Sequence, residues 1–105
     1  MTELREQARA AYNRSLAQKN LLETMSARMV LAHAGGLWVC DQSFIAMLHC
    51  YQDQSEIVLL DSQNIPRKID TLELLEKAKY RHQEVMNAWL VAYAELAKVR
   101  TAKDV

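Results

Sequence analysis

The chain has 105 residues, enough for one domain, and half of them are apolar, which excludes a disordered chain. Its 13 basic and 13 acidic residues give a formal net charge of +0, so we expect no nucleic-acid partner. The sequence contains no apolar stretch long enough to span a bilayer and no apolar signal core near residue 1. We therefore expect no membrane contact and a location in the cytoplasm, or in a particle assembled there.

Two long segments, one at each end of the chain, repeat apolar and small residues at spacings of three and four. The N-terminal set is Leu4, Ala8, Ala11, Ser15, Gln18, Leu22, Met25, Met29 and Ala32. The C-terminal set is Leu75, Ala78, His82, Val85, Trp89, Ala92, Leu96 and Val99. This spacing is the heptad repeat of a coiled coil, so each segment is predicted to be a long helix.

The helix boundaries follow from local signals. The first helix is predicted over residues 2–34, since Gly35 and Gly36 end it. The last helix is predicted over residues 71–103, with Asp70 as its N-cap and Glu73 completing a capping box. The fold class is therefore mainly α, with two long antiparallel helices closed by a small head.

The head, residues 35–70, is predicted to contain a short helix and a β-hairpin. Asp41 is a candidate N-cap for the short helix. Residues 56–60 are rich in β-branched side chains, and Pro66 requires an extended or turning residue before it. Residues 56–60 and 65–69 therefore read as two strands, with a helix over 55–62 as the alternative. Residues 1–105 would form one domain.

Helices of matched length predict that residue i of the first helix lies near residue 105 − i of the last. Under this register the apolar repeats meet in one seam. Its main members are Leu22, Met25, Met29, Leu75, Val85, Trp89 and Leu96. His82, Ser15 and Gln18 interrupt the seam, and polar residues at such positions specify register more often than they sense pH.

A second apolar set lies outside the predicted seam. Its members are Tyr12, Leu16, Met86, Leu90, Tyr93 and Ala97. The predicted register places Tyr12 level with Tyr93, so the set would merge into one patch near the open end of the hairpin. Apolar patches of this kind mark protein interfaces, and we expect these residues to form a partner interface.

Chemistry-bearing motifs are weak. His33, Cys40, His49 and Cys50 lie within 18 residues and could in principle hold Zn²⁺, but their spacing fits no zinc motif. The sequence has no phosphate-binding glycine loop and no nucleophile motif. We therefore expect no enzyme activity, no cofactor and no metal.

The expected function is non-enzymatic protein–protein interaction. The preferred hypothesis is a homo-oligomeric helical component of a viral particle or other large complex, or an adaptor or chaperone-like subunit. One alternative is a small regulator that binds one protein through the head, because residues 35–70 hold two basic and five acidic residues. The other alternative is a metal-binding domain that uses the four histidine and cysteine residues.

Overall fold

The protein is mostly helical, with three helices and two small antiparallel sheets in the residues that the structure describes. This computed structural model describes the backbone of residues 2–104 and the side chains of residues 3–98. In chain order the elements are α1 (Thr2–Arg28), β1 (Val30–His33), β2 (Gly36–Val39), α2 (Gln42–Cys50), β3 (Glu56–Leu60), β4 (Pro66–Asp70) and α3 (Thr71–Asp104). The mainly α class is confirmed, with more β structure than the sequence predicted.

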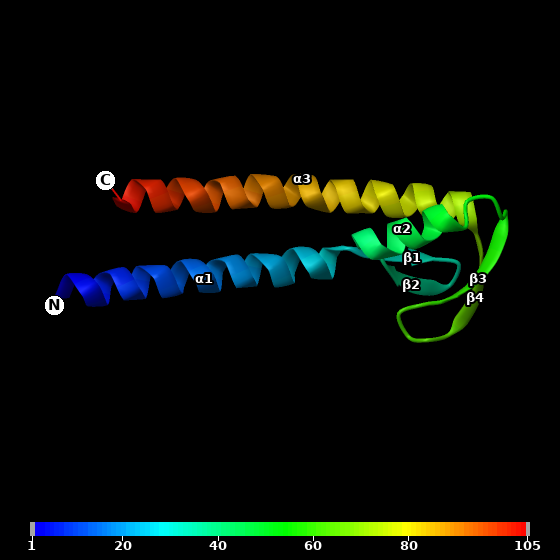
Figure 1. Cartoon of the computed structure of the whole chain (residues 1–105), viewed down its shortest axis with the longest axis horizontal. Coiled ribbons are helices and arrows are strands. Elements are labelled where there is room, and N and C mark those ends of the chain that lie inside the picture. Colours follow the sequence, from blue (N-terminus) through cyan, green and yellow to red (C-terminus); the bar gives the residue numbers. More distant parts are fainter. Residues whose placement is uncertain (1, 105) are drawn as a thin grey trace.

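The two long helices run antiparallel beside each other, and the remaining elements gather at one end (Figure 1). The molecule measures 63 × 23 × 21 Å. Both termini lie at the end opposite to the head (Figure 1). Because the helices extend far beyond the head, most of their length can be covered only by each other or by another molecule.

The first helix is shorter than predicted, because α1 ends at Arg28 and residues 30–33 form β1. β1 pairs with β2 so that His33 lies opposite Gly36. The connecting residues Ala34 and Gly35 have φ values of 51° and 79°. Two positive φ values at the centre of a two-residue loop are typical of a type I′ hairpin turn. The glycine pair therefore ends a hairpin turn, not a helix.

Three predictions for the head and the last helix are confirmed. The Asp41 carboxylate accepts the Phe44 N–H at 2.8 Å and caps α2. β3 and β4 form the predicted antiparallel hairpin, so the helical alternative over residues 55–62 is wrong. Asp70 accepts the Glu73 N–H at 3.0 Å at the start of α3.

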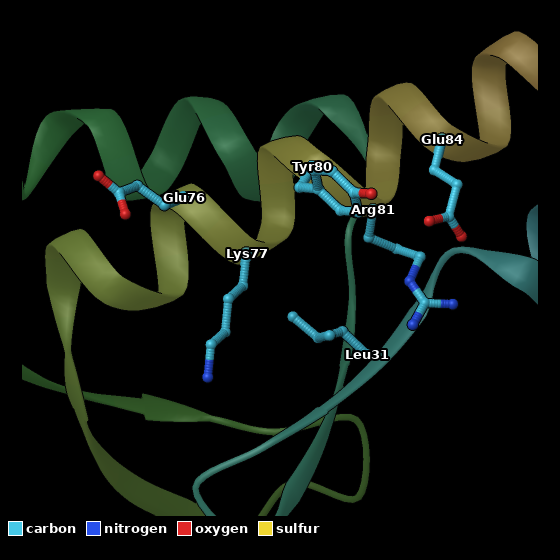
Figure 2. A pocket seen from close by; sticks show the side chains of 6 residues that line it. All are labelled: Leu31, Glu76, Lys77, Tyr80, Arg81 and Glu84. Carbon is cyan, nitrogen blue, oxygen red and sulfur yellow. The ribbon is translucent and has the colours of Figure 1, made fainter.

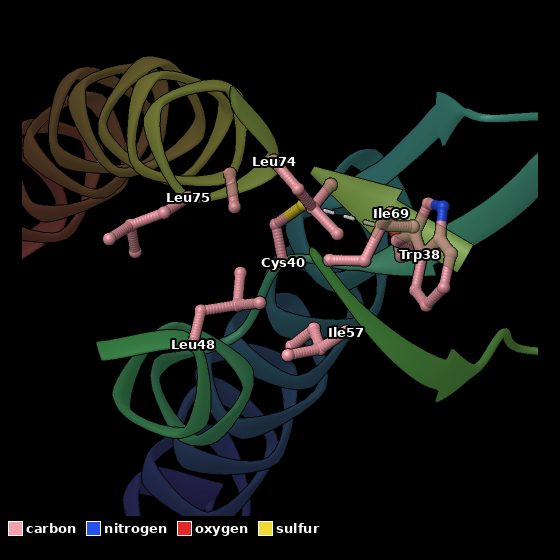
Figure 3. Packing of buried hydrophobic residues seen from close by; sticks show 8 residues of the cluster. Trp38, Cys40, Leu48, Ile57, Ile69, Leu74 and Leu75 are labelled. Atoms are coloured by element: carbon pink, nitrogen blue, oxygen red, sulfur yellow. Dashed lines mark hydrogen bonds between the residues drawn. The ribbon is translucent and has the colours of Figure 1, made fainter. Parts of the chain in front are cut away.

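The hydrophobic core lies in the head, where α2, both hairpins and the first turns of α3 meet (Figure 3). Its buried residues are Trp38, Cys40, Leu48, Ile57, Ile69, Leu74, Leu75 and Ala78. Trp38 is the largest of them and is 1% exposed, stacking on the Phe44 ring at a centroid distance of 5.9 Å. The indole N–H donates to the His33 carbonyl at 2.8 Å, so the polar atom of this buried ring is satisfied.

The buried carboxylate of Asp61 holds the β3–β4 turn and joins it to the other hairpin. It accepts the N–H groups of Gln63 at 2.8 Å and Ile65 at 3.0 Å, and the Arg67 Nε–H at 2.7 Å. These hydrogen bonds, led by that of Arg67, lower the pKa of the Asp61 carboxyl below its ordinary value.

Arg67 passes directly over Gly36, so the two hairpins are in close contact. A Cβ atom at Gly36 would lie 2.6 Å from Arg67 Nε and 2.8 Å from Asp61 Oδ2. The Ser62 N–H also donates to the Leu37 carbonyl at 2.9 Å. Because Gly36 has no side chain, the Arg67 guanidinium can pass over β2 and reach Asp61. This contact explains why the buried position 36 is a glycine.

The predicted register between the long helices is wrong by five or more residues. The 105 − i rule places Gln18 level with Asn87, but Gln18 lines a hollow together with Tyr93 and Ala97 of α3. The cause is β1, since a strand rises about 3.3 Å per residue and a helix about 1.5 Å. Four or five extended residues move α1 away from the head by roughly 8 Å, which equals about five helical residues.

Gly36→Ala should destabilise the fold by about 1–3 kcal/mol, because the new methyl group displaces Arg67 from a buried carboxylate. Chemical denaturation measures the loss. The control is the same change in an Arg67→Ala background, where the obstructing side chain is gone and the added cost should largely disappear. Equal losses in both backgrounds would contradict the proposed contact.

The Asp61 carboxylate also predicts an acid limb of stability. The pKa of the Asp61 carboxyl is lower in the folded protein than in the unfolded chain, where it is about 3.9. The ionised carboxylate therefore stabilises the fold above about pH 3.9, and this stabilisation is lost as the pH falls through the folded-state pKa. Denaturation midpoints should therefore fall below about pH 4. Asp61→Asn should lower the neutral-pH midpoint and flatten this acid dependence; an unchanged acid limb would show that other carboxyls produce it.

Candidate functional site

The contact between α1 and α3 is centred on a small buried cluster next to the head. Met25, Met29 and Val85 are buried there, and half-buried side chains pack around them: Leu21, Ala88, Trp89 and Ala92. Leu75, predicted in this seam, belongs to the head core instead. The 105 − i rule places Trp89 level with Leu16, but Trp89 packs against this methionine cluster because of the shifted register.

The inward side of α1 differs from the predicted one. Leu22 is 50% exposed and is not part of the seam, and the adjacent Leu21 takes the inward position. The half-buried residues continue through Ala17 and Arg14. At 100° per residue, this inward line is rotated by roughly 70° from the predicted repeat. The N-terminal repeat therefore points beside α3, not into it.

This rotation leaves an apolar surface along one side of the helix pair, which we call the uncharged face. Its residues are all exposed: Leu4, Ala8, Ala11, Ser15 and Leu22 on α1, and Met86, Leu90, Tyr93 and Ala97 on α3. On each helix these positions lie about 100° around the axis from the residues that face the other helix, in the direction of increasing residue number. Because the helices are antiparallel, this shared offset places both sets on the same side of the helix pair. None of the nine is charged, and Lys19 lies at the border.

A small hollow between the helices supports this placement. It is lined by Arg14, Gln18, Tyr93, Leu96 and Ala97. Tyr93 and Ala97 of the uncharged face therefore lie beside Gln18 of α1. Gln18 is about 60° from Ser15 around the axis of α1, so it borders the uncharged face. The hollow also shows that Gln18 is level with Tyr93, and not with Asn87 as the predicted register had it. Leu96, predicted in the seam, is half-buried and also lines this hollow.

The opposite side of the helix pair is charged. A depression of about 260 Å³ lies there. Figure 2 shows Leu31 of β1 facing α3 in this depression. The α3 residues around it are Glu76, Lys77, Tyr80, Arg81 and Glu84. This side carries both acidic and basic side chains, and Lys77 is paired to Glu73 at 3.2 Å. The depression is shallow and holds a mixture of both charges, so it selects no ligand class.

Two members of the predicted interface set lie away from the rest. Tyr12 and Leu16 are 67% and 43% exposed, but their phase places them on the side of α1 that faces away from α3. The α3 members, Met86, Leu90, Tyr93 and Ala97, lie on the uncharged face. The predicted merging of all six residues into one patch is therefore wrong, because α1 is rotated and shifted relative to the prediction.

The structure does not bring the four candidate metal ligands together. Cys40 is buried in the head core, whereas His49 and Cys50 are exposed at the end of α2. His33 lies on β1 beside Lys77, whose positive charge opposes a cation. Within the described residues no group of three or more His, Cys, Asp or Glu side chains could hold a metal ion.

The Cys40 region is a structural connection between the head and α3. Burial raises the pKa of the Cys40 thiol to about 11, so the sulfur is protonated at neutral pH and is a poor nucleophile. The Cys40 carbonyl oxygen lies 3.0 Å from His82 Nδ1. The backbone N–H of Cys40 donates to the Met29 carbonyl at 2.8 Å. His82 was expected beside Glu23; it instead fixes the head against α3.

The acidic residues of the head have structural roles. Asp41 and Asp70 cap helices, and Asp61 is paired with Arg67. Glu56 forms an ion pair with Lys68 across the β3–β4 hairpin at 2.9 Å. A regulator that binds through an acidic head needs carboxylates available to a partner, and four of the five acidic residues counted in residues 35–70 are already engaged.

Comparisons with known proteins return nothing: no family model matches the chain, and neither a curated protein nor a solved structure does. Among the described residues, no helix is both long and apolar enough to cross a membrane. The function must therefore be argued from the surfaces of this chain.

The placement of Cys40 and the two histidines predicts that the protein needs no metal. Protein purified without chelator should contain well under one zinc ion per chain, and EDTA should leave the melting temperature unchanged. Structural zinc supplies folding energy, so its removal would lower stability strongly if the site existed. A stoichiometric metal lost together with helicity would contradict this prediction.

Proposed function

We propose that this protein is a non-enzymatic assembly component that self-associates through the uncharged face. It would serve as a helical part of a larger particle or complex, or as an adaptor or chaperone-like subunit, and act in the cytoplasm. The observation that supports this is the segregation of the helix pair into one apolar, uncharged side and one charged side. Such segregation serves no purpose in an isolated helix pair in water, where both outer sides contact solvent.

The size of the uncharged face fits a weak or transient interface. At about 1.5 Å per residue, residues 4–22 of α1 span about 27 Å and residues 86–97 of α3 about 17 Å, and each helix is about 9 Å wide. This gives roughly 400 Å² per copy and about 800 Å² for two copies, which is the size of a weak or transient protein contact. An apolar patch of a few hundred Å² is often functional.

A second copy is the partner that the face fits best. The face lacks charged groups that would have to meet opposite charges on a different protein. Two copies brought face to face by a two-fold axis would place four helices around one apolar centre, which is a common arrangement for amphipathic helix pairs. The small residues Ala8, Ala11, Ser15 and Ala97 would allow the aromatic ring of Tyr93 to pack between helices.

The test is the mass in solution of Leu90→Glu/Tyr93→Glu. We expect the variant to remain helical but to lose this contact, so that its mass in solution falls below that of the wild type. Each buried Leu or Tyr contributes roughly 1.5–3 kcal/mol, and burying two carboxylates costs more still. A wild-type protein that is monomeric at high micromolar concentration would overturn the proposal.

Matched controls lie on the same helices. Val91 is 64% exposed on the charged side of α3, so Val91→Glu should leave the mass unchanged. On α1, Leu22→Glu should disrupt association, whereas Leu16→Glu, at similar exposure but facing away, should not. If the controls change the mass as much as the test variants do, the contact does not use the uncharged face.

A further inference from the structure

We infer that β3 is a second self-association site, at which two copies of the chain pair their β3 strands edge to edge. Among the described residues β3 pairs with β4 alone, so one edge of this strand has no partner strand. A hollow of about 340 Å³ lies along β3, and it is also lined by Tyr51 and Gln54, which follow α2, and by Lys68 of β4. The inference rests on the proposed self-association and adds a distinct surface to it.

The hydrogen-bond pattern shows which backbone groups face the open edge. The Thr71 N–H donates to the Ser55 carbonyl and the Asp61 N–H to the Ile65 carbonyl, both at 3.0 Å, in the same register as β3 and β4. Hydrogen-bonded pairs alternate along an antiparallel ladder, so the even-numbered residues of β3 direct their N–H and C=O groups outward. These residues are Glu56, Val58 and Leu60.

The side chains along this edge are apolar and exposed. Val58 is 64% exposed and Leu60 is 61% exposed. An edge strand with free backbone groups and apolar side chains is a template for pairing with another strand. Proteins that keep an edge unpaired place charges, proline or a bulge on it, and β3 has only Glu56 at one end.

The other strand edges of the head are protected or covered. The outward residues of β4 are Pro66, Lys68 and Asp70; proline has no N–H to donate and the other two are charged. β1 packs against α3. On β2, the outward carbonyl of Leu37 already accepts the Ser62 N–H. The absence of such protection on β3 therefore distinguishes it from its neighbours.

A second β3 strand is the occupant that satisfies this edge most fully. If a two-fold axis passes through the Val58 pair, Val58 exchanges both hydrogen bonds with Val58 of the second copy, and Glu56 does so with Leu60 in each direction. Every outward N–H and C=O of β3 then has a partner. This register also places each Glu56 opposite a leucine, so the two carboxylates do not face each other. The next register in which outward groups face each other is shifted by two residues, and it leaves one end of each strand unpaired.

The first experiment measures mass in solution for variants at position 58. Val58→Pro removes the outward N–H without removing a bond to β4, so the hairpin should persist while the β3 contact is lost. We expect the wild type to use both contacts, and Val58→Pro to leave pairs joined through the uncharged face alone. Val58→Thr, which keeps the N–H and the β preference, should retain the wild-type mass.

The two contacts are separated by combining variants. Leu90→Glu/Tyr93→Glu should leave pairs joined through β3, and adding Val58→Pro should give monomers. If Val58→Pro leaves the mass unchanged while Leu90→Glu/Tyr93→Glu lowers it, the β3 inference is wrong and the proposed function stands. If only Val58→Pro lowers the mass, β3 pairing stands and the uncharged face is not a contact.

A second experiment does not depend on how proline affects folding. In a Cys50→Ser background, Val58→Cys gives each copy one cysteine beside the proposed two-fold axis. The Cα atoms of these two cysteines would lie about 5.5 Å apart, which is within the range of a disulfide. Mild oxidation should join two chains. Lys68→Cys, opposite Val58 on β4, is the control, because its Cα atoms would lie about 15 Å apart. Equal cross-linking of the two variants would overturn the inference.

Discussion

The extended backbone of β1 is the constraint on which the arrangement of the helix pair depends. It joins α1 to the head while β1 itself lies against α3, so it sets both the level of α1 along α3 and its rotation. Met25 and Met29 then reach Val85, whereas Leu22 points to solvent. The apolar repeat of α1 is thus divided between a short internal contact and an outward face. The uncharged face is a consequence of this connection.

Stability and association are located in different parts of the molecule. The head holds the largest buried side chains, and the two hairpins are joined there by Asp61, Arg67 and the space left at Gly36. On α1, the described side chains before Arg14 are all exposed, and a helix in water is only marginally stable without packing. The head therefore supports a folded protomer, and the outer helices gain most from contact with a second copy.

Sequence patterns predicted the elements whose signals are local. The caps at Asp41 and Asp70, the β3–β4 hairpin and the α3 repeat depend on neighbours within a few residues. The pattern failed at residues 29–34, because Met29 and Ala32 fit a helical repeat and only pairing with β2 makes this segment a strand. It failed again at Leu21 and Leu22, where two adjacent leucines fit either rotation. These failures moved the candidate face, since register and rotation are tertiary properties.

The two proposed contacts differ in chemistry and therefore in how they limit assembly. The uncharged face would join copies by burying side chains, and β3 would join them by backbone hydrogen bonds. Both are isologous, so each is closed by its own two-fold axis. Perpendicular two-fold axes that meet give a closed tetramer, whereas axes that do not meet give an open chain of copies. The connection between the head and α3 through His82 and Cys40 fixes how these two axes lie relative to each other. Their relative position and angle, set within the protomer, decide between a discrete particle and an extended one.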